Sequence, residues 1–390
     1  MSGKRIYLDH AATSWPKCPK ALQAAQEFIA DCGATAGRGS YTSAQLADSW
    51  LLRARNEVGQ LLGCSATHQI AFCHSGTHAL NALLLGLIRP GDRVLTSESE
   101  HNSVLRPLHW MREEAGVELH LVPSNGAAIA SLADADAILS KSPDGQTSWI
   151  ALTHASNVTG AVQDLAEWSN LARRHNTRLI VDASQTLGYL PIDLDSLQIA
   201  GLASAGHKGL RALAGTGLVA VCNELIDSLR PIMRGGTGVS SEQIAAPPEW
   251  PHTIEVGNLN LPGIVSMAAA AKSLNESPAY DVWKPQFKKL IQGLRNQSSI
   301  HIFGDRTMTN DQTERMPLAS LRVEGWDNHD LANVLDTSFG IECRSGFHCA
   351  GAIHPRLNGA ETGTLRLSVG HSTTLEEIET TLQAFECILH

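Results

Sequence analysis

The sequence predicts an α/β protein with a large, mostly parallel sheet domain followed by a smaller α+β domain. The chain has 390 residues, which is enough to bury a large core and to divide into two domains. In its first part, short apolar strands alternate with helical stretches, a pattern typical of a helix-covered parallel sheet. A proline-rich segment, residues 245–251, separates this part from one with fewer strands in a less regular order.

The first part opens with a helical stripe of apolar residues between Leu46 and Leu62, which ends at Gly63. A second helix, residues 77–88, stops before a Pro-Gly pair that cannot continue it. Runs of apolar and β-branched residues between and after these helices predict strands at 70–73, 93–96, 118–122, 149–153 and 178–182.

Beyond the proline-rich segment, the pattern predicts helices at 263–275, 283–296 and 374–388 and strands at 318–323 and 364–369. We therefore expect a large domain of residues 16–245 and a small domain of residues 246–390. Residues 1–15 are expected to form an arm that joins the small domain.

Composition and charge narrow the classes of function. The net charge is −9, the pI is about 6.0 and no basic run occurs, which argues against nucleic-acid and anionic-membrane partners. The longest apolar stretch, Ala79 to Ile88, is too short to span a bilayer, and the first residues lack the apolar core of a secretory signal. Eight cysteines without a CxxC pair suit reduced thiols, so we expect a cytoplasmic protein.

A lysine and an aspartate at strand exits point to a cofactor. Asp182 ends the strand 178–182, and Lys208 follows in Ser204-Ala-Gly-His-Lys-Gly. Ligands of α/β sheets lie at the carboxyl ends of strands. Pyridoxal 5'-phosphate (PLP) needs both groups, since a lysine forms its Schiff base and an acid keeps its pyridine nitrogen protonated. Either residue alone would be an ordinary cap or a solvated charge, but the pair predicts PLP.

A candidate phosphate site lies where the strand 70–73 runs into His74-Ser-Gly-Thr and then into a helix. Small residues there leave backbone N–H groups free at a positively polarised helix end. The chain has neither a P-loop nor a GxGxxG pattern, which disfavours nucleoside triphosphates and dinucleotides. A single phosphate monoester, as on PLP, suits this site better than those ligands. Alone, the motif would be interpreted as an ordinary capped helix; together with Lys208, it predicts a phosphate site.

Histidines offer a second group for such a site. His101 follows another strand exit, where it could stack on an aromatic cofactor and relay protons. His74 and His78 have the four-residue spacing of a helical metal pair, but no third ligand follows at a recognisable spacing. We therefore expect no metal site.

A second cluster, Arg344-Ser-Gly-Phe-His-Cys349-Ala, places a cysteine beside an arginine and a histidine in a glycine-containing loop. Such neighbours lower the pKa of a thiol, and the thiolate is the nucleophile. Arg366 alternates with apolar residues on the strand 364–369, and its planar fork matches a carboxylate. Taken alone, a buried cysteine and a structural salt bridge would be the simpler explanations.

Together these clusters resemble the cysteine desulfurases of the class V aminotransferase group, which are fold-type I PLP-dependent transferases. The spacing of arginine, four residues, cysteine and alanine is similar to the SufS-type branch. The resemblance covers nearly the whole chain and is carried by seven motifs in order: Tyr7-Leu-Asp-His-Ala-Ala-Thr, Gly37-Arg-Gly, Thr153-His-Ala-Ser-Asn157-Val-Thr-Gly, Val181-Asp-Ala-Ser-Gln185, Gly206-His-Lys208, Arg234-Gly-Gly-Thr237-Gly and Arg344-Ser-Gly-Phe-His-Cys349-Ala.

The resemblance implies how PLP would be held in the large domain. Lys208 would form the Schiff base, and Asp182 would pair with the pyridinium nitrogen. Gln185 would bind the phenolic oxygen, and His101 would stack on the ring and act in catalysis. The phosphate would be held by residues from several loops, one of them from the second subunit of a homodimer: Gly76, Thr77, His207 and Thr237.

The resemblance also implies the reaction. L-cysteine would be converted to L-alanine, with its carboxylate bound by Asn157 and Arg366 and with Arg344 beside them. Cys349, on a loop of the small domain, would take the sulfur as a persulfide. A sulfur-acceptor protein would then receive it, for iron–sulfur cluster assembly.

Three departures from the family pattern bear on this expectation. Ala205 stands where relatives often have a serine that reaches the phosphate. Ala212-Leu213 replaces a Gly-Pro pair after the lysine, and Tyr41 replaces a histidine near the cofactor entrance. None of them removes a chemically essential group.

Other functions remain open at this point. A selenocysteine lyase or another PLP-dependent C–S lyase would release the chalcogen directly, with Cys349 secondary. An aminotransferase is disfavoured, because nothing indicates specificity for a second keto acid. From a different class, a sulfur-relay module would carry persulfide on Cys349 without producing it, and such a module needs neither Lys208 nor Asp182.

Overall fold

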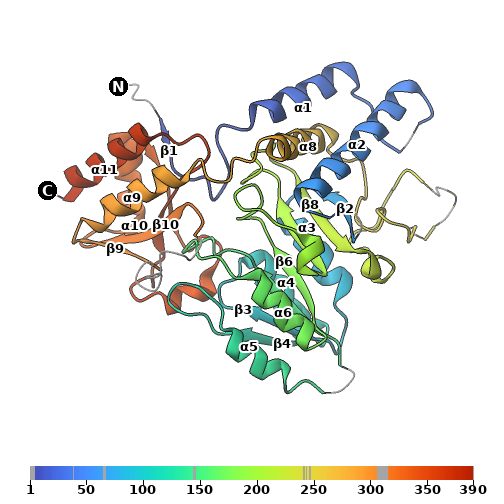
Figure 1. Ribbon diagram of the computed structural model, residues 1–390, viewed down its shortest axis with the longest axis horizontal. Helices are drawn as coiled ribbons and strands as arrows, with labels where there is room; N and C mark the ends of the chain where they lie inside the picture. The colour runs from blue at the N-terminus through green and yellow to red at the C-terminus, as the bar shows by residue number, and fades with distance from the viewer. Residues whose placement is uncertain are drawn as a thin grey trace.

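Two sheets covered by helices form the body of the protein. The computed structural model describes residues 5–37, 39–64, 67–143, 146–239, 242, 244–245, 247–304 and 315–389. Figure 1 shows the two sheet-containing parts side by side, with both ends of the chain next to the smaller one. The expected α/β class is confirmed.

The larger sheet is mixed, and the mostly parallel order expected for it is confirmed. Its strand order is β2-β8-β7-β6-β5-β3-β4. The pairings from β7 through β4 are parallel, whereas β8 runs antiparallel to both β7 and β2. The strands are β2 (His68–Cys73), β3 (Arg93–Ser97), β4 (Glu118–Val122), β5 (Ser148–Thr153), β6 (Arg178–Asp182), β7 (Gly201–Ala205) and β8 (Gly217–Cys222).

Both faces of this sheet are buried along most of its strands, whereas the edge strand β4 is partly exposed. In β2, Ile70 and Phe72 pack into one core, and Ala71 and Cys73 pack into the other. Burial on both faces explains why the strands read as continuous apolar runs. The first core contains α1 (Pro19–Asp31), α2 (Thr42–Leu61), α5 (Leu132–Leu139), α6 (Leu165–Arg174), α7 (Leu194–Leu197) and α8 (Leu261–Glu276), and the second contains α3 (Gly76–Leu87), α4 (Asn102–Glu114) and the 3-10 helix η1 (Asn223–Ser228).

The smaller sheet is antiparallel, with the order β12-β13-β10-β9. Its strands are β9 (Ile300–Ile302), β10 (Leu318–Val323), β12 (Arg344–Gly346) and β13 (Thr364–Ser368), and its helices are α9 (Lys284–Arg295), α10 (Asn328–Phe339), α11 (Leu375–Leu389) and the 3-10 helix η2 (Gly351–Arg356). The chain start reaches this part, because β1 (Ile6–Tyr7) pairs in parallel with β11 (Ile341–Glu342). Helix α8 lies beyond the boundary expected at residue 245, yet it packs with α1 and α2 on the larger sheet.

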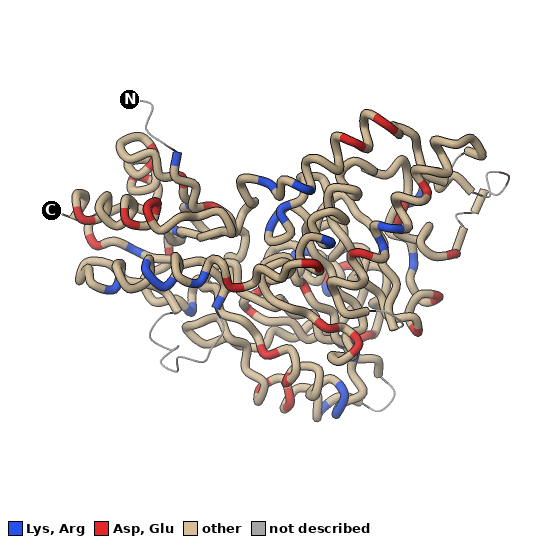
Figure 2. Tube along the Cα trace, turned by 45° about the horizontal axis from the view of Figure 1, so that its top comes forward, with Lys and Arg blue, Asp and Glu red and all other residues tan. Residues whose placement is uncertain are grey.

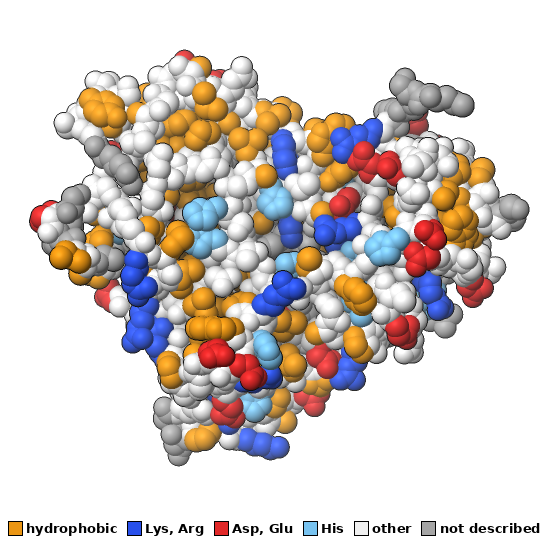
Figure 3. Space-filling model, turned by 180° about the vertical axis from the view of Figure 1, so that it is seen from behind, with side chains coloured by type: hydrophobic (Ala, Val, Ile, Leu, Met, Phe, Trp, Pro, Cys, Tyr) orange, Lys and Arg blue, Asp and Glu red, His pale blue; other side chains and the backbone are white. Residues whose placement is uncertain are grey.

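The surface carries both signs of charge. Figure 2 shows lysine and arginine interspersed with aspartate and glutamate along the described chain, and side chains of both signs lie on the face of the molecule seen in Figure 3. Among the helices that the structure describes, none is long and apolar enough to cross a membrane. All eight cysteines are free thiols.

Candidate active site

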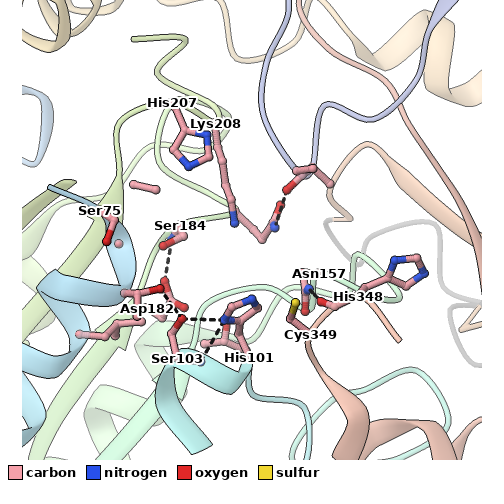
Figure 4. A pocket seen from close by; sticks show the side chains of 18 of the residues that line it. Ser75, His101, Ser103, Asn157, Asp182, Ser184, His207, Lys208, His348 and Cys349 are labelled. Atoms are coloured by element: carbon pink, nitrogen blue, oxygen red, sulfur yellow. Dashed lines mark hydrogen bonds between the residues drawn. The ribbon is translucent and has the colours of Figure 1, made fainter. Parts of the chain in front are cut away.

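A pocket of about 220 Å³ lies where the carboxyl ends of β6 and β7 face the loop after β12. This volume suits a compact ligand better than a dinucleotide. Figure 4 shows Lys208 and Cys349 entering the pocket from opposite sides. The lining residues include eleven of the twelve site residues that the sequence predicts: Gly76, Thr77, His101, Asn157, Asp182, Gln185, His207, Lys208, Arg344, Cys349 and Arg366.

Lys208 and Asp182 form the buried charged centre of this pocket. Asp182 ends β6 with 5% of its surface exposed, and its Oδ1 accepts a hydrogen bond of 2.9 Å from Ser184 N. No other hydrogen bond reaches this carboxylate from the described residues, so Oδ2 is available to a ligand. Burial lowers the pKa of the Lys208 amine, opposed by the charge of Asp182. An amine with a lowered pKa is ready to form a Schiff base.

The turn that carries Lys208 is closed by backbone hydrogen bonds. Arg211 N donates to Lys208 O at 2.8 Å, and Ala212 N donates to Gly206 O at 3.0 Å. Leu213 N donates to Ser266 Oγ at 2.9 Å, which ties the turn to α8. The Ala212-Leu213 pair therefore still yields an anchored turn in place of the Gly-Pro pair of relatives.

The N-terminus of α3 forms a cradle that fits the phosphate of PLP. A Cβ atom at Gly76 would lie 3.0 Å from Ser184 Oγ and 3.3 Å from Ala205 N, so a side chain there would fill the space. Ser75 caps the helix by accepting from His78 N, and the N–H groups of Gly76 and Thr77 in the same turn have no intrahelical acceptor. A phosphate at this helix end would meet N–H donors and the helix dipole.

One hydroxyl near the cradle lies where it could take the place of the serine that Ala205 replaces. Ser184 was not singled out from the sequence, but it lines the pocket beside Gly76 and within the described residues its hydroxyl makes no hydrogen bond. His207 adds a neutral donor, because burial lowers its pKa to about 4. The residues present therefore fit PLP: a buried lysine, an aspartate with a free oxygen and a phosphate cradle.

His101 is held in one tautomer by the start of α4. Its Nδ1 accepts a hydrogen bond of 3.0 Å from the backbone N–H of Ser103 and lies 2.9 Å from Ser103 Oγ (Figure 4). The Ser103 hydroxyl in turn lies 2.8 Å from Thr77 Oγ1. An Nδ1 that accepts from a backbone amide carries no proton, so neutral His101 holds its proton on Nε2. Burial and the charge of Lys208 also lower the pKa of His101, which disfavours the doubly protonated ring.

A buried carboxyl group that sequence reasoning missed lies beneath Asp182. Glu100 is completely buried, and burial raises its pKa to about 8, with a further contribution from the charge of Asp182. Ser97 Oγ and Thr153 N donate to its two oxygens, each at 2.6 Å. Glu100 thus ties the ends of β3 and β5 together as a neutral acid at pH 7. The only sequence signal was its place before His101.

Replacing Glu100 by glutamine should change how stability depends on pH. An acid whose pKa is higher in the folded protein contributes its full stabilisation below the pKa that it has in the unfolded chain, about 4.5. This stabilisation is lost as the pH rises toward its folded pKa of about 8. The free energy of unfolding of the wild type, relative to Glu100→Gln, should therefore fall by up to about 1.4 kcal/mol per pH unit across that window. Urea unfolding at a series of pH values measures this difference.

Glu118→Gln is a matched control, because hydrogen bonds from Gln146, His120 and Arg93 lower the pKa of Glu118 to about 2. Glu118 is ionised in both folded and unfolded chains above pH 5, so its difference curve should be flat there. A flat curve for Glu100→Gln as well would contradict the neutral state of Glu100.

Cys349 sits on a loop with a constrained backbone. His348 and Cys349 have φ values of 51° and 58°, in the left-handed region that non-glycine residues rarely adopt. Two hydrogen bonds hold this conformation: Asn157 Nδ2 donates to His348 O at 2.6 Å, and Asn102 N donates to Cys349 O at 2.7 Å. The thiol of Cys349 is exposed, so it can meet both a substrate in the pocket and an acceptor outside.

Of the two groups expected to place a positive charge beside Cys349, Arg344 and His348, only the arginine carries one. His348 is buried, its ring points away from the pocket toward Thr364, and burial lowers its pKa to about 2. It is therefore neutral, and the expectation that it favours the thiolate is wrong. Cys343, the nearest other thiol, is half-buried, and burial raises its pKa to about 12.

The two arginines of the pocket differ in their surroundings. Arg344 is exposed, and no ion pair to it occurs among the described residues. Arg366 is almost completely buried; its Nη1 donates to Asn157 O and its Nη2 to Asp9 Oδ1, both at 2.9 Å. Asn157 thus links Arg366 to the loop of Cys349.

Some predicted residues do not reach this pocket. Thr237 does not line it and instead donates to Val239 O in an exposed segment. Tyr41 is 58% exposed at the start of α2 and also does not line the pocket. Arg38 of the Gly-Arg-Gly motif lies outside the described residues. Within the described chain, no group of three or more His, Cys, Asp or Glu could hold a metal, and the rings of His74 and His78 stack at 4.3 Å.

Comparison with known proteins agrees with this geometry. The profile of the family described as Aminotransferase class-V matches residues 6–381. A "Probable cysteine desulfurase" of Methanothermobacter thermautotrophicus is 30% identical over 96% of this chain and 92% of its own. Among solved structures, an apo cysteine desulfurase from Thermococcus onnurineus superposes with a TM-score of 0.87 at 27% identity, covering 99% and 94% of the two chains. The Escherichia coli cysteine desulfurase CsdA superposes with a TM-score of 0.82 at 25% identity, with the same coverage.

Proposed function

The chain belongs to the aminotransferase class-V family, and on that premise we propose that it is a PLP-dependent cysteine desulfurase acting through Cys349. The reaction converts L-cysteine into L-alanine and leaves the sulfur as a persulfide on this thiol. One observation carries the proposal: an exposed thiol on a constrained loop shares a pocket with a buried lysine–aspartate pair. The named relatives, which are cysteine desulfurases, support the same activity.

Cofactor and substrate would be held by separate groups of the pocket. PLP supplies an electron sink when bound. Asp182 Oδ2 would hold the proton of the pyridine nitrogen, and the start of α3 would hold the phosphate. Arg366 and Asn157, linked by a hydrogen bond, would bind the substrate carboxylate, with exposed Arg344 beside them.

Lys208 is the proton carrier of this site. Its amine is buried and has a lowered pKa, so it can accept the proton from the substrate Cα and return it later. His101 is unsuited to this role, because Ser103 N–H occupies Nδ1 and the proton already sits on Nε2. His101 would instead stack on the ring and donate a hydrogen bond through Nε2. We therefore propose that His101 orients the ring, in place of the catalytic role that the sequence predicts for it.

The sulfur transfer needs no external oxidant. The Cys349 thiolate attacks the substrate sulfur, so that an S–S bond forms and the substrate C–S bond breaks. The electron pair of the C–S bond stays with the three-carbon fragment and is protonated there, which yields L-alanine. Arg344 is exposed and lines the same pocket as Cys349, so its positive charge is available to the site of sulfur transfer.

The finer assignments rest on sequence motifs. We propose the SufS-type branch from the spacing of Arg344, Cys349 and Ala350. We also propose a homodimer, because Thr237 lies in an exposed segment away from its own pocket and would reach the partner's phosphate. A cytoplasmic location and transfer of sulfur to an acceptor protein for iron–sulfur cluster assembly complete the proposal.

A product assay tests the proposed function. The wild-type holoenzyme should form L-alanine and sulfide in equal amounts from L-cysteine when a thiol reductant is present. Without reductant, alanine formation should stop after about one turnover per site, since the persulfide stays on the protein. Alanine formation that continues at the same rate without reductant would indicate a lyase that releases sulfur directly.

A further inference from the structure

The N-terminal arm, residues 5–12, is built into the pocket. Beyond β1, Ser368 N donates to Leu8 O at 2.7 Å, and Ala11 N donates to Ser368 Oγ at 2.9 Å. Ala11 O receives a hydrogen bond of 3.1 Å from Gln185 Nε2. The arm therefore runs along β13 and places Asp9 next to Arg366 of that strand.

Asp9 neutralises a buried arginine. The Arg366 side chain is 2% exposed, whereas the Asp9 side chain is 22% exposed, and Nη2 and Oδ1 lie 2.9 Å apart. Among the described residues, Asp9 is the only carboxylate that forms an ion pair with either arginine of the pocket. Arg344 and Arg366 also repel each other, which increases the need for this negative charge.

Part of the hydrogen-bonding capacity of the Arg366 guanidinium group is left for a ligand. Nη1 is used by Asn157 O and Nη2 by Asp9. Nε is buried and finds no hydrogen-bond partner within the described chain. Arg366 lines the pocket, and no acceptor among the described residues uses the second N–H of Nη1 or of Nη2, so an acceptor that enters the pocket can bind there.

We propose that Asp9 is a resident counter-ion that sets how tightly this site holds the carboxylate of substrate and product. This inference rests on the proposed function, in which Arg366 anchors the L-cysteine carboxylate. A bound carboxylate has to share the guanidinium with Asp9, and the two negative charges repel at short range. Asp9 thus keeps Arg366 paired when the pocket holds no ligand and weakens binding of L-alanine, which has the same carboxylate and has to leave.

Asp9→Asn separates charge from contact. Asparagine retains an oxygen acceptor for Nη2 but removes the negative charge. We expect the KM for L-cysteine and the Kd for L-alanine to fall together, by about three- to tenfold, since one like charge near the carboxylate is gone. The Kd for L-alanine is measured on the holoenzyme from the change that the ligand causes in the visible absorption of PLP.

Glu342→Gln is the matched control. Glu342 lies on β11, beside the arm, and pairs with Arg5 of the arm at 2.6 Å; it is half-buried and does not line the pocket. This variant removes an ion pair of the same arm without changing the charge at Arg366, so both constants should stay at wild-type values. Equal effects in the two variants would mean that Asp9 only fastens the arm.

The test of the role of Asp9 can fail or succeed independently of the test of the proposed function. A wild type that forms no alanine from cysteine removes the proposed function, while the ratio of the two Kd values for L-alanine still decides the role of Asp9. An unchanged or weaker affinity in Asp9→Asn overturns the inference. So does the absence of measurable L-alanine binding in both proteins, because Arg366 would then not be a carboxylate anchor.

Discussion

Lys208→Ala should abolish turnover of L-cysteine and remove the visible absorption band of lysine-bound PLP. The pocket has one lysine, and its amine is the only group there that can both form a Schiff base and carry the Cα proton. Loss of a positioned proton carrier alone lowers rates by about 10²- to 10⁴-fold, and loss of the covalent link adds to this. Absorption spectra and alanine release measure the two effects separately.

Lys20→Ala is a suitable control for this variant. Lys20 forms an exposed ion pair of 3.2 Å with Glu276, and exposed pairs of this kind contribute little to stability. Its absorption band and turnover should match the wild type. An unchanged band in Lys208→Ala would show that PLP is bound through another residue, and the assignment of the pocket would fail.

Cys349→Ser should bind PLP normally, yet release little alanine and carry no persulfide. A hydroxyl at this position has the size of the thiol but is a much weaker nucleophile for sulfur. We expect turnover to fall by about 10²-fold or more, because attack on the substrate sulfur is the step that the other residues cannot perform. Alanine release with reductant present, together with the PLP spectrum, measures the loss.

This result distinguishes the desulfurase from its rivals. A selenocysteine lyase or other C–S lyase that releases the chalcogen directly would retain activity in Cys349→Ser. A sulfur-relay module would show no PLP band in either protein. Cys387→Ser is the matched control, since Cys387 is also exposed but lies on α11 outside the pocket lining, and it should behave as the wild type.

Most strands that contain large apolar residues were predictable from the sequence, but β8 was missed, and so was β7, which consists mainly of small residues. The strand expected at 118–122 agrees with β4, and those expected at 93–96 and 149–153 agree with β3 and β5 within one residue. The pattern does not predict β7, Gly-Leu-Ala-Ser-Ala, because small residues have low strand propensity. They are needed there because α3 packs closely: a Cβ atom at Gly201 would lie 3.1 Å from Leu83 Cδ2.

The site was predictable as far as it depends on strand exits. Asp182, His101 and Lys208 follow strands or their turns, and topology brings such positions to one edge of the sheet. The protonated state of Glu100 and the ion pair of Asp9 with Arg366 could not be predicted. Both depend on burial and on contacts between residues that are distant in the sequence.

The most direct test of the central claim is mass spectrometry of the holoenzyme after incubation with L-cysteine in the absence of reductant. The proposed function predicts one added sulfur atom on the peptide that contains Cys349, at about one per chain and in step with the L-alanine released. A persulfide on Cys343, or alanine released while Cys349 remains an unmodified thiol, would contradict it.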